Sequence, residues 1–127
     1  EGPPKDPAVH SGLLADLSRT DHLDELEQFN FSSIDMLVVN LYPFEETLKK
    51  GSEHDELIEN IDIGGPSMIR AAAKNYKWTL PVVNPDKYDE LINILKINNK
   101  TVSEHARKQL SAEAFSLTAY YDSLISK

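Results

Sequence analysis

Two apolar runs are the clearest feature in the pattern of hydrophobic and polar residues along the chain. Residues 34–42 are almost continuously apolar, and residues 79–83 form a second, shorter run. Such runs are typical of strands that are buried on both faces, as in a parallel sheet. The first run ends in Asn40, Tyr42 and Pro43, at the strand end where open α/β sheets bind ligands.

Helical patterns surround both runs. Apolar residues recur at helical spacing from Tyr88 to Leu95, which predicts an amphipathic helix that begins at Asn84 and Pro85. The form of a capping box at 101–104 predicts a long helix, over about 103–127, whose apolar residues occupy more than one face. We therefore expect this helix to contact a second partner, such as another domain or subunit. Shorter helices are predicted from Thr20, over 43–50, over 53–60 and from Pro66.

The N-terminal part of the chain has a weaker pattern. Residues 1–7 hold three prolines and predict an extended arm, and residues 8–15 form an apolar stretch too short to classify. Strands that alternate with helices favour an α/β domain. Two strands do not make a stable parallel sheet, so further strands either escape the pattern or lie outside this chain.

Composition narrows the class of protein. A chain of 127 residues predicts one domain, and its formal charge of −8 argues against sequence-independent binding of nucleic acid. The absence of cysteine excludes disulfides, thiolate metal sites and a cysteine nucleophile, and it fits a cytoplasmic protein. No apolar run approaches the length of a membrane span, and the four histidines are too scattered to predict a metal site.

The segment from Glu59 to Asn75 carries the candidate chemistry. Asp62 precedes two glycines, Pro66 stands at a plausible helix start, and Lys74 follows about three helical turns later. Glycines before a helix let the backbone approach a ligand, and the first N–H groups of the helix point toward it. The alternative is an ordinary strand-to-helix turn with Gly65 as its N-cap.

Three motifs, in the same order and spacing, resemble the cyclohydrolase domain of the bifunctional AICAR transformylase/IMP cyclohydrolase family. The resemblance rests on segments 39–44, 59–66 and 70–75, and it continues through 7–12 and 114–122. It implies a methylglyoxal synthase-like parallel sheet with helices on both faces. It also implies the last step of inosinate (IMP) synthesis, in which formyl-AICAR closes its ring and loses water.

The resemblance also implies which residues act. Asp62 would be the acid/base, while Lys74 and Tyr42 would stabilise the oxyanion that forms on the formyl oxygen. Asn40 would hold the carboxamide, and the backbone of Ile63 and Gly64 would contact the base. No cofactor is implied for this step, because 10-formyltetrahydrofolate belongs to a transformylase domain that nothing here resembles. The parent enzyme would be a cytoplasmic homodimer, without nucleic-acid or membrane partners.

The resemblance has one large gap. The family domain starts earlier, with Ser-Asp-Lys and Ser-Thr-Gly-Gly stretches that bind the nucleotide phosphate, and this chain has neither. A further family lysine falls on Pro3, and its role is not transferred to Lys5. We expect residues 1–127 to be the second part of the domain, without its first strands. An effector-binding or structural module without activity is the alternative, although such a module needs no acid/base.

The missing phosphate-binding stretches generate a prediction. Phosphate contacts usually anchor nucleotides, so the chain alone should bind inosinate weakly. Isothermal calorimetry with inosinate tests this directly, and tight binding to the isolated chain would contradict it.

Overall fold

The computed structural model describes residues 6–41, 44–51 and 53–126. Pro3, Lys5, Tyr42, Pro43 and Ser52 lie outside the described residues. The described elements, in chain order, are α1 (Pro7–Leu14), α2 (Thr20–Gln28), β1 (Met36–Val38), α3 (Phe44–Lys49), α4 (His54–Glu59), α5 (Gly64–Lys74), β2 (Leu80–Val82), the 3-10 turn η1 (Pro85–Lys87), α6 (Tyr88–Ile97) and α7 (Glu104–Ile125).

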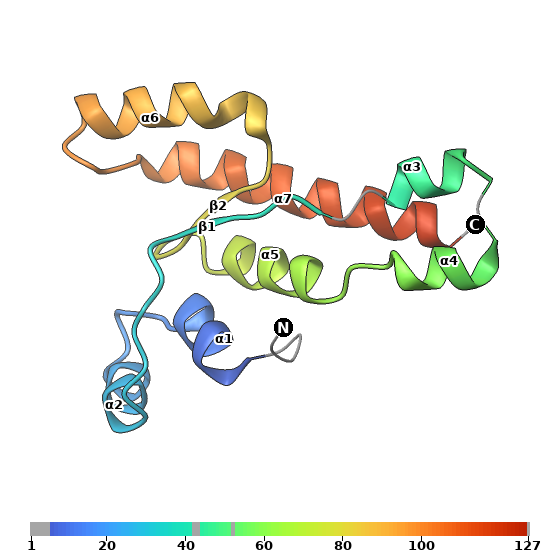
Figure 1. Ribbon diagram of the computed structural model, residues 1–127. Helices are drawn as coiled ribbons and strands as arrows, with labels where there is room; N and C mark the ends of the chain where they lie inside the picture. The colour runs from blue at the N-terminus through green and yellow to red at the C-terminus, as the bar shows by residue number, and fades with distance from the viewer. Residues whose placement is uncertain (1–5, 42–43, 52, 127) are drawn as a thin grey trace.

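The two strands form a small parallel sheet at the centre of the molecule. Leu37 is paired with Pro81, and hydrogen bonds from Leu80 N–H to the Asp35 carbonyl and from Val39 N–H to the Val82 carbonyl extend the ladder at both ends. The chain passes from β1 to β2 through α3, α4 and α5 (Figure 1). This confirms the two predicted strands and the incomplete α/β fold.

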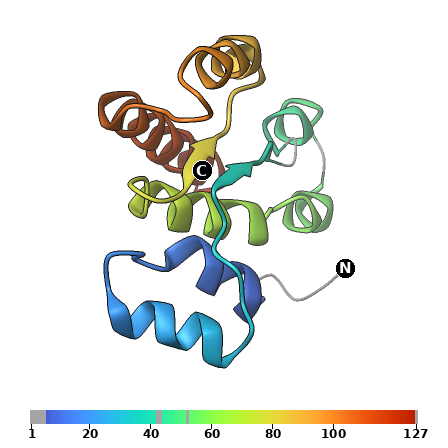
Figure 2. The ribbon, with the colours of Figure 1, turned by 90° about the vertical axis from the view of Figure 1, so that its left-hand side faces the viewer.

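Helix α5 covers one face of the sheet, between α1 and α7 (Figure 2). Its small residues Ala71, Ala72 and Ala73 are buried, which allows these neighbours to approach closely. On the other face, Leu80 and Val82 pack against Leu91 of α6 and against Val102, which precedes α7. The predicted covering of both faces by helices is therefore present over β2.

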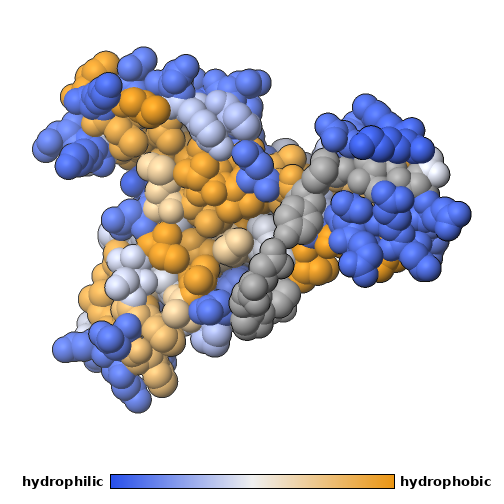
Figure 3. All heavy atoms as spheres, viewed as in Figure 1, coloured by the Kyte–Doolittle hydropathy of each residue, from blue (hydrophilic) through white to orange (hydrophobic). Residues whose placement is uncertain are grey.

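The prediction that the first strand is buried on both faces is wrong for this chain. Leu37 packs toward α1 and α5, but Met36 and Val38 are 36% and 51% exposed. No helix among the described residues covers their side of β1, because α6 lies over β2 (Figure 1). Figure 3 shows the resulting apolar surface in the middle of the molecule.

The unclassified stretch near the N-terminus is helix α1. Asp6 is its N-cap and accepts hydrogen bonds from the N–H groups of Ala8 and Val9, while Pro7 occupies the first helical position. The predicted extended arm over 1–7 is therefore wrong for Pro7, and residues 1–5 lie outside the described residues. At the other end of α1, the side-chain amide of Asn75 donates hydrogen bonds to the carbonyls of Leu13 and Ala15, both 2.8 Å long.

The long helix α7 is confirmed, but its N-cap is Ser103, so the predicted capping box, which would begin at Thr101, does not form. Among the described residues it contacts α5, β2 and α3, while Phe115 and Tyr120 remain 36% and 50% exposed. The expected contact of α7 with another domain or subunit stays a prediction. Ser111 donates to the carbonyl of Ala73 at 2.7 Å, and the Arg70 guanidinium lies 5.6 Å from the centre of the Phe115 ring. None of the described helices is both long and apolar enough to cross a membrane.

Gly12 in α1 generates a stability prediction. A Cβ at this position would lie 2.5 Å from the carbonyl oxygen of Ser32, and that backbone cannot move easily because Ile34 N–H bonds to the Gly12 carbonyl. Gly12→Ala should lower the free energy of unfolding by about 2 kcal/mol in chemical denaturation. Gly51→Asn is the control, because nothing lies within 4 Å of Gly51 and asparagine tolerates its positive φ. Equal stability of the two variants would contradict the prediction.

Candidate active site at the N-terminus of helix α5

The carboxylate of Asp62 caps the first turn of α5. Its Oδ1 accepts a hydrogen bond of 2.8 Å from the backbone N–H of Gly65. The helix begins at Gly64, two residues before the predicted start at Pro66, and Ile63 rather than Gly65 is the N-cap residue. A negative charge is stabilised here by the positive end of the helix dipole. The alternative, a strand-to-helix turn with Gly65 as its N-cap, is wrong in both parts: the turn follows helix α4, and Gly65 is not the N-cap.

The position of the Asp62 carboxylate leaves no room for a side chain at Gly65. A Cβ at Gly65 would be 2.7 Å from Asp62 Oδ2 and 2.9 Å from Oδ1. The glycine at position 65 thus allows the carboxylate to lie directly over the helix start.

Tyr121, which the sequence analysis did not single out, holds the backbone of the same turn. Its hydroxyl accepts a hydrogen bond of 2.8 Å from Asp62 N–H and donates one of 3.4 Å to the Asn60 carbonyl. The ring is buried and packs edge-on against Phe44, with ring centroids 6.1 Å apart. Burial raises the pKa of the Tyr121 hydroxyl, while the hydrogen bond from the Asp62 backbone acts in the opposite direction.

Asn40, Asp62, Ile63 and Gly64 lie at one end of the sheet. Asn40 follows the carboxyl end of β1, and α5 starts at that end because it runs back antiparallel to the strand (Figure 1). Asn40 and Ile63 are exposed, and Gly64 and Asp62 are half-buried. A carboxylate, an amide and helix N-terminal backbone on one exposed edge can bind and protonate a polar ligand.

Lys74 lies at the other end of α5. It is the last residue of the helix, and a helix rises about 1.5 Å per residue, so about 15 Å separate it from Gly64. The structure therefore does not bring Lys74 and Asp62 together. Tyr42, the second predicted oxyanion stabiliser, lies outside the described residues.

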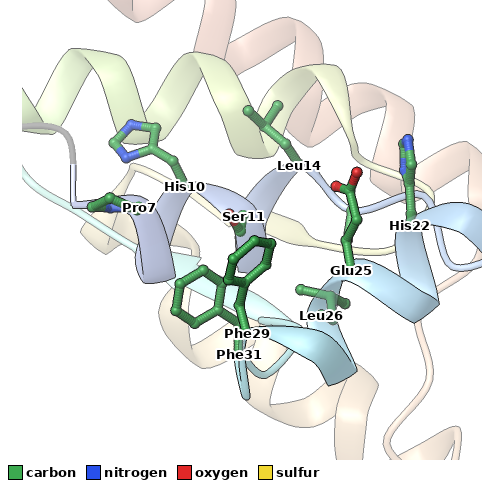
Figure 4. Close-up of a pocket in the computed structure, with 10 residues that line it drawn as sticks. Pro7, His10, Ser11, Leu14, His22, Glu25, Leu26, Phe29 and Phe31 are labelled. Atoms are coloured by element: carbon green, nitrogen blue, oxygen red, sulfur yellow. The ribbon is translucent and has the colours of Figure 1, made fainter.

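A cavity of about 530 Å³ lies elsewhere, between α1, α2 and the segment that follows α2. Figure 4 shows its apolar wall, including Phe29 and Phe31, whose rings stack with centroids 5.8 Å apart. Its two histidines are bonded within the protein: His10 Nε2 to Ser67 Oγ at 3.0 Å, and His22 Nδ1 to Asp16 N–H at 3.0 Å. None of the predicted site residues lines this cavity, so it carries no part of the predicted chemistry.

A metal has no evident place in the described part of the chain. No group of three or more His, Asp or Glu residues there is arranged to hold an ion.

The described residues form a small parallel sheet with helices packed on it and a capped turn between α4 and α5, which is an α/β arrangement. A family model described as "MGS-like domain" matches residues 7–67, and one described as "AICARFT/IMPCHase bienzyme" matches residues 72–127. Together the two matches span most of the chain, and they confirm the resemblance and the fold class predicted from the sequence.

Curated relatives agree with these matches. The chain is 51% identical over 120 residues to the bifunctional purine biosynthesis protein PurH of Clostridioides difficile (strain 630), and 47% identical over 120 residues to that of Persephonella marina. In both cases the match covers 94% of this chain but 23% of the relative. A solved structure described as "Crystal structure of ForH" matches with a TM-score of 0.78 and 28% identity, over 94% of this chain and 61% of the other.

The contact between Gly65 and Asp62 generates a second prediction. In Gly65→Ala the new methyl group should push the Asp62 carboxylate off the helix start, lowering the free energy of unfolding by about 1–2 kcal/mol through the lost cap. A crystal structure or backbone NMR shifts of residues 62–66 would detect the displacement. Ser67→Ala, one turn into the same helix, should leave the Asp62 cap in place. An unmoved carboxylate in Gly65→Ala would contradict the argument.

Proposed function

We propose that this chain carries ring-closing groups for the conversion of formyl-AICAR to inosine monophosphate. The observation that supports this most strongly is the Asp62 carboxylate, held by the first turn of α5 at the exposed edge that also bears Asn40. The two family matches direct the choice of reaction, since the relatives are bifunctional purine biosynthesis proteins.

The reaction requires proton transfers and charge stabilisation. The carboxamide nitrogen attacks the formyl carbon and forms a C–N bond, while the formyl oxygen takes up negative charge and then a proton. The attacking carboxamide nitrogen loses one of its two protons. Loss of the proton on the formamido nitrogen, with departure of the hydroxyl as water, then forms the ring C=N bond. A carboxylate within hydrogen-bond reach can accept the nitrogen proton and later return one to the leaving hydroxyl.

We assign these roles by position. Asp62 is the acid/base, Asn40 orients the carboxamide, and the backbone of Ile63 and Gly64 contacts the base. Tyr42 and Lys74 are proposed as oxyanion stabilisers. Because Lys74 lies about 15 Å from the helix start, it acts on the same substrate only if the nucleotide extends along α5.

The remaining parts of the proposal follow from the family. The step uses no cofactor, because the addition of the carboxamide nitrogen and the later loss of water need only proton transfers. In the whole protein, which we propose to be a cytoplasmic homodimer, 10-formyltetrahydrofolate would serve a separate transformylase domain. The missing phosphate-binding portion of the domain would be the chain's partner in binding the nucleotide.

Asp62→Asn tests the acid/base role. Asparagine keeps an oxygen that can accept the Gly65 N–H bond, so the cap survives while proton transfer is lost. In the full natural protein that contains this sequence, kcat for ring closure, followed by absorbance, should fall at least about 100-fold. Asp55→Asn, in the first turn of α4, is the control and should retain activity. Normal activity in Asp62→Asn would contradict the proposed function.

Lys74→Ala tests the oxyanion role separately. If Lys74 stabilises developing charge, kcat should fall about 100-fold. If it serves only as a cation at the helix C-terminus, stability should fall by less than about 1 kcal/mol and kcat should stay unchanged. Lys77→Ala, an exposed lysine three residues further on, is the matched control. An unchanged kcat would remove Lys74 from the proposed site.

A further inference from the structure

We propose that Tyr121 is a positioning residue for Asp62: its hydroxyl fixes the backbone from which the acid/base carboxylate projects. This rests on the proposed function of Asp62 as acid/base. Nothing in the sequence motifs assigns Tyr121 a role, since it stands in α7, 59 residues beyond Asp62 in the chain.

The hydroxyl makes two bonds to one short turn. A phenol can donate one hydrogen bond and accept others, and Tyr121 accepts from Asp62 N–H at 2.8 Å while it donates to the Asn60 carbonyl at 3.4 Å. The shorter bond is well within the usual range and is the stronger constraint. Asn60 is the C-cap of α4, so the hydroxyl spans the junction between α4 and the start of α5.

Asp62 is therefore held at both of its ends. Its side-chain Oδ1 accepts from Gly65 N–H at 2.8 Å, and its backbone N–H donates to Tyr121. The first bond holds the carboxylate on the helix, and the second fixes the backbone from which the carboxylate projects. The second bond adds to the backbone bond from Ile61 N–H to the Ile58 carbonyl, which holds the same turn from α4. A precisely placed acid/base stabilises the transition state more than a mobile one.

Tyr121 is itself rigid. It is 5% exposed, and its ring packs edge-on against Phe44, which is 4% exposed and opens α3. Phe44 belongs to the same motif, 39–44, as two of the predicted site residues. Tyr121 thus joins the segment after β1 to the turn before α5, and burial raises the pKa of its hydroxyl.

The adjacent tyrosine supplies a matched comparison. Tyr120 is 50% exposed, and its hydroxyl donates to Glu45 Oε1 at 3.0 Å at the surface. Tyr121→Phe and Tyr120→Phe each remove one hydroxyl from neighbouring positions of one helix. Only the first removes a contact to Asp62, and it keeps the ring that packs against Phe44.

Ring-closure kinetics of the full natural protein test the proposal. Tyr121→Phe should lower kcat about tenfold with KM within about twofold of the wild-type value, because one hydrogen bond that orients the acid/base is lost. Tyr120→Phe should match the wild type. In an Asp62→Asn background, Tyr121→Phe should change kcat by less than about twofold, since there is no acid/base left to position.

Amide hydrogen exchange of this chain gives a readout that does not depend on activity. The Asp62 amide should exchange about tenfold faster in Tyr121→Phe and unchanged in Tyr120→Phe. Wild-type protein without ring-closing activity would refute the proposed function, and unchanged exchange at Asp62 would still overturn the positioning role. Additive effects of Asp62→Asn and Tyr121→Phe on kcat, or an unchanged kcat in Tyr121→Phe, would also overturn it.

Discussion

Close packing around α5 is the constraint on which the rest of the molecule depends. The buried alanines 71–73 let α1, α7 and the strands approach one helix, and larger residues there would force them apart. Because both ends of α5 are tied to other elements, its position also determines where its first turn lies. That turn carries Asp62, so the candidate site inherits its geometry from a helix core made largely of methyl groups.

The sequence predicted the elements whose signals are local. Capping residues and apolar spacing located α6 and α7, and the two apolar runs located both strands. The exposed face of β1 could not be predicted, because an apolar run reports what a strand can bury and not what covers it in this chain. Helix α1 was missed although Asp6-Pro7 is a standard cap and first-turn pair, because the prolines around it suggested an extended arm.

The residues of the candidate site also fall into two groups, those that the sequence can predict and those that it cannot. Asp62 and the glycines could be found from the sequence, because they are contiguous and their spacing has a local meaning. Tyr121 could not, since its contact with Asp62 depends on how α7 lies across the start of α5. The wide separation of Lys74 from Asp62 also depends on the structure. Helical spacing gives the distance, but only if all residues from Gly64 to Lys74 form one helix, as they do in α5.

Asn75 has a consequence for how the chain unfolds. The side-chain amide of Asn75, at the end of α5, donates to two carbonyls at the end of α1. If either helix opens, the amide and the two carbonyls lose these hydrogen bonds. The two helices should therefore open as a single cooperative unit, although 62 and 60 positions in the sequence separate Asn75 from its acceptors Leu13 and Ala15. Long-range coupling of this kind slows folding, because a large loop must close before the amide meets its acceptors.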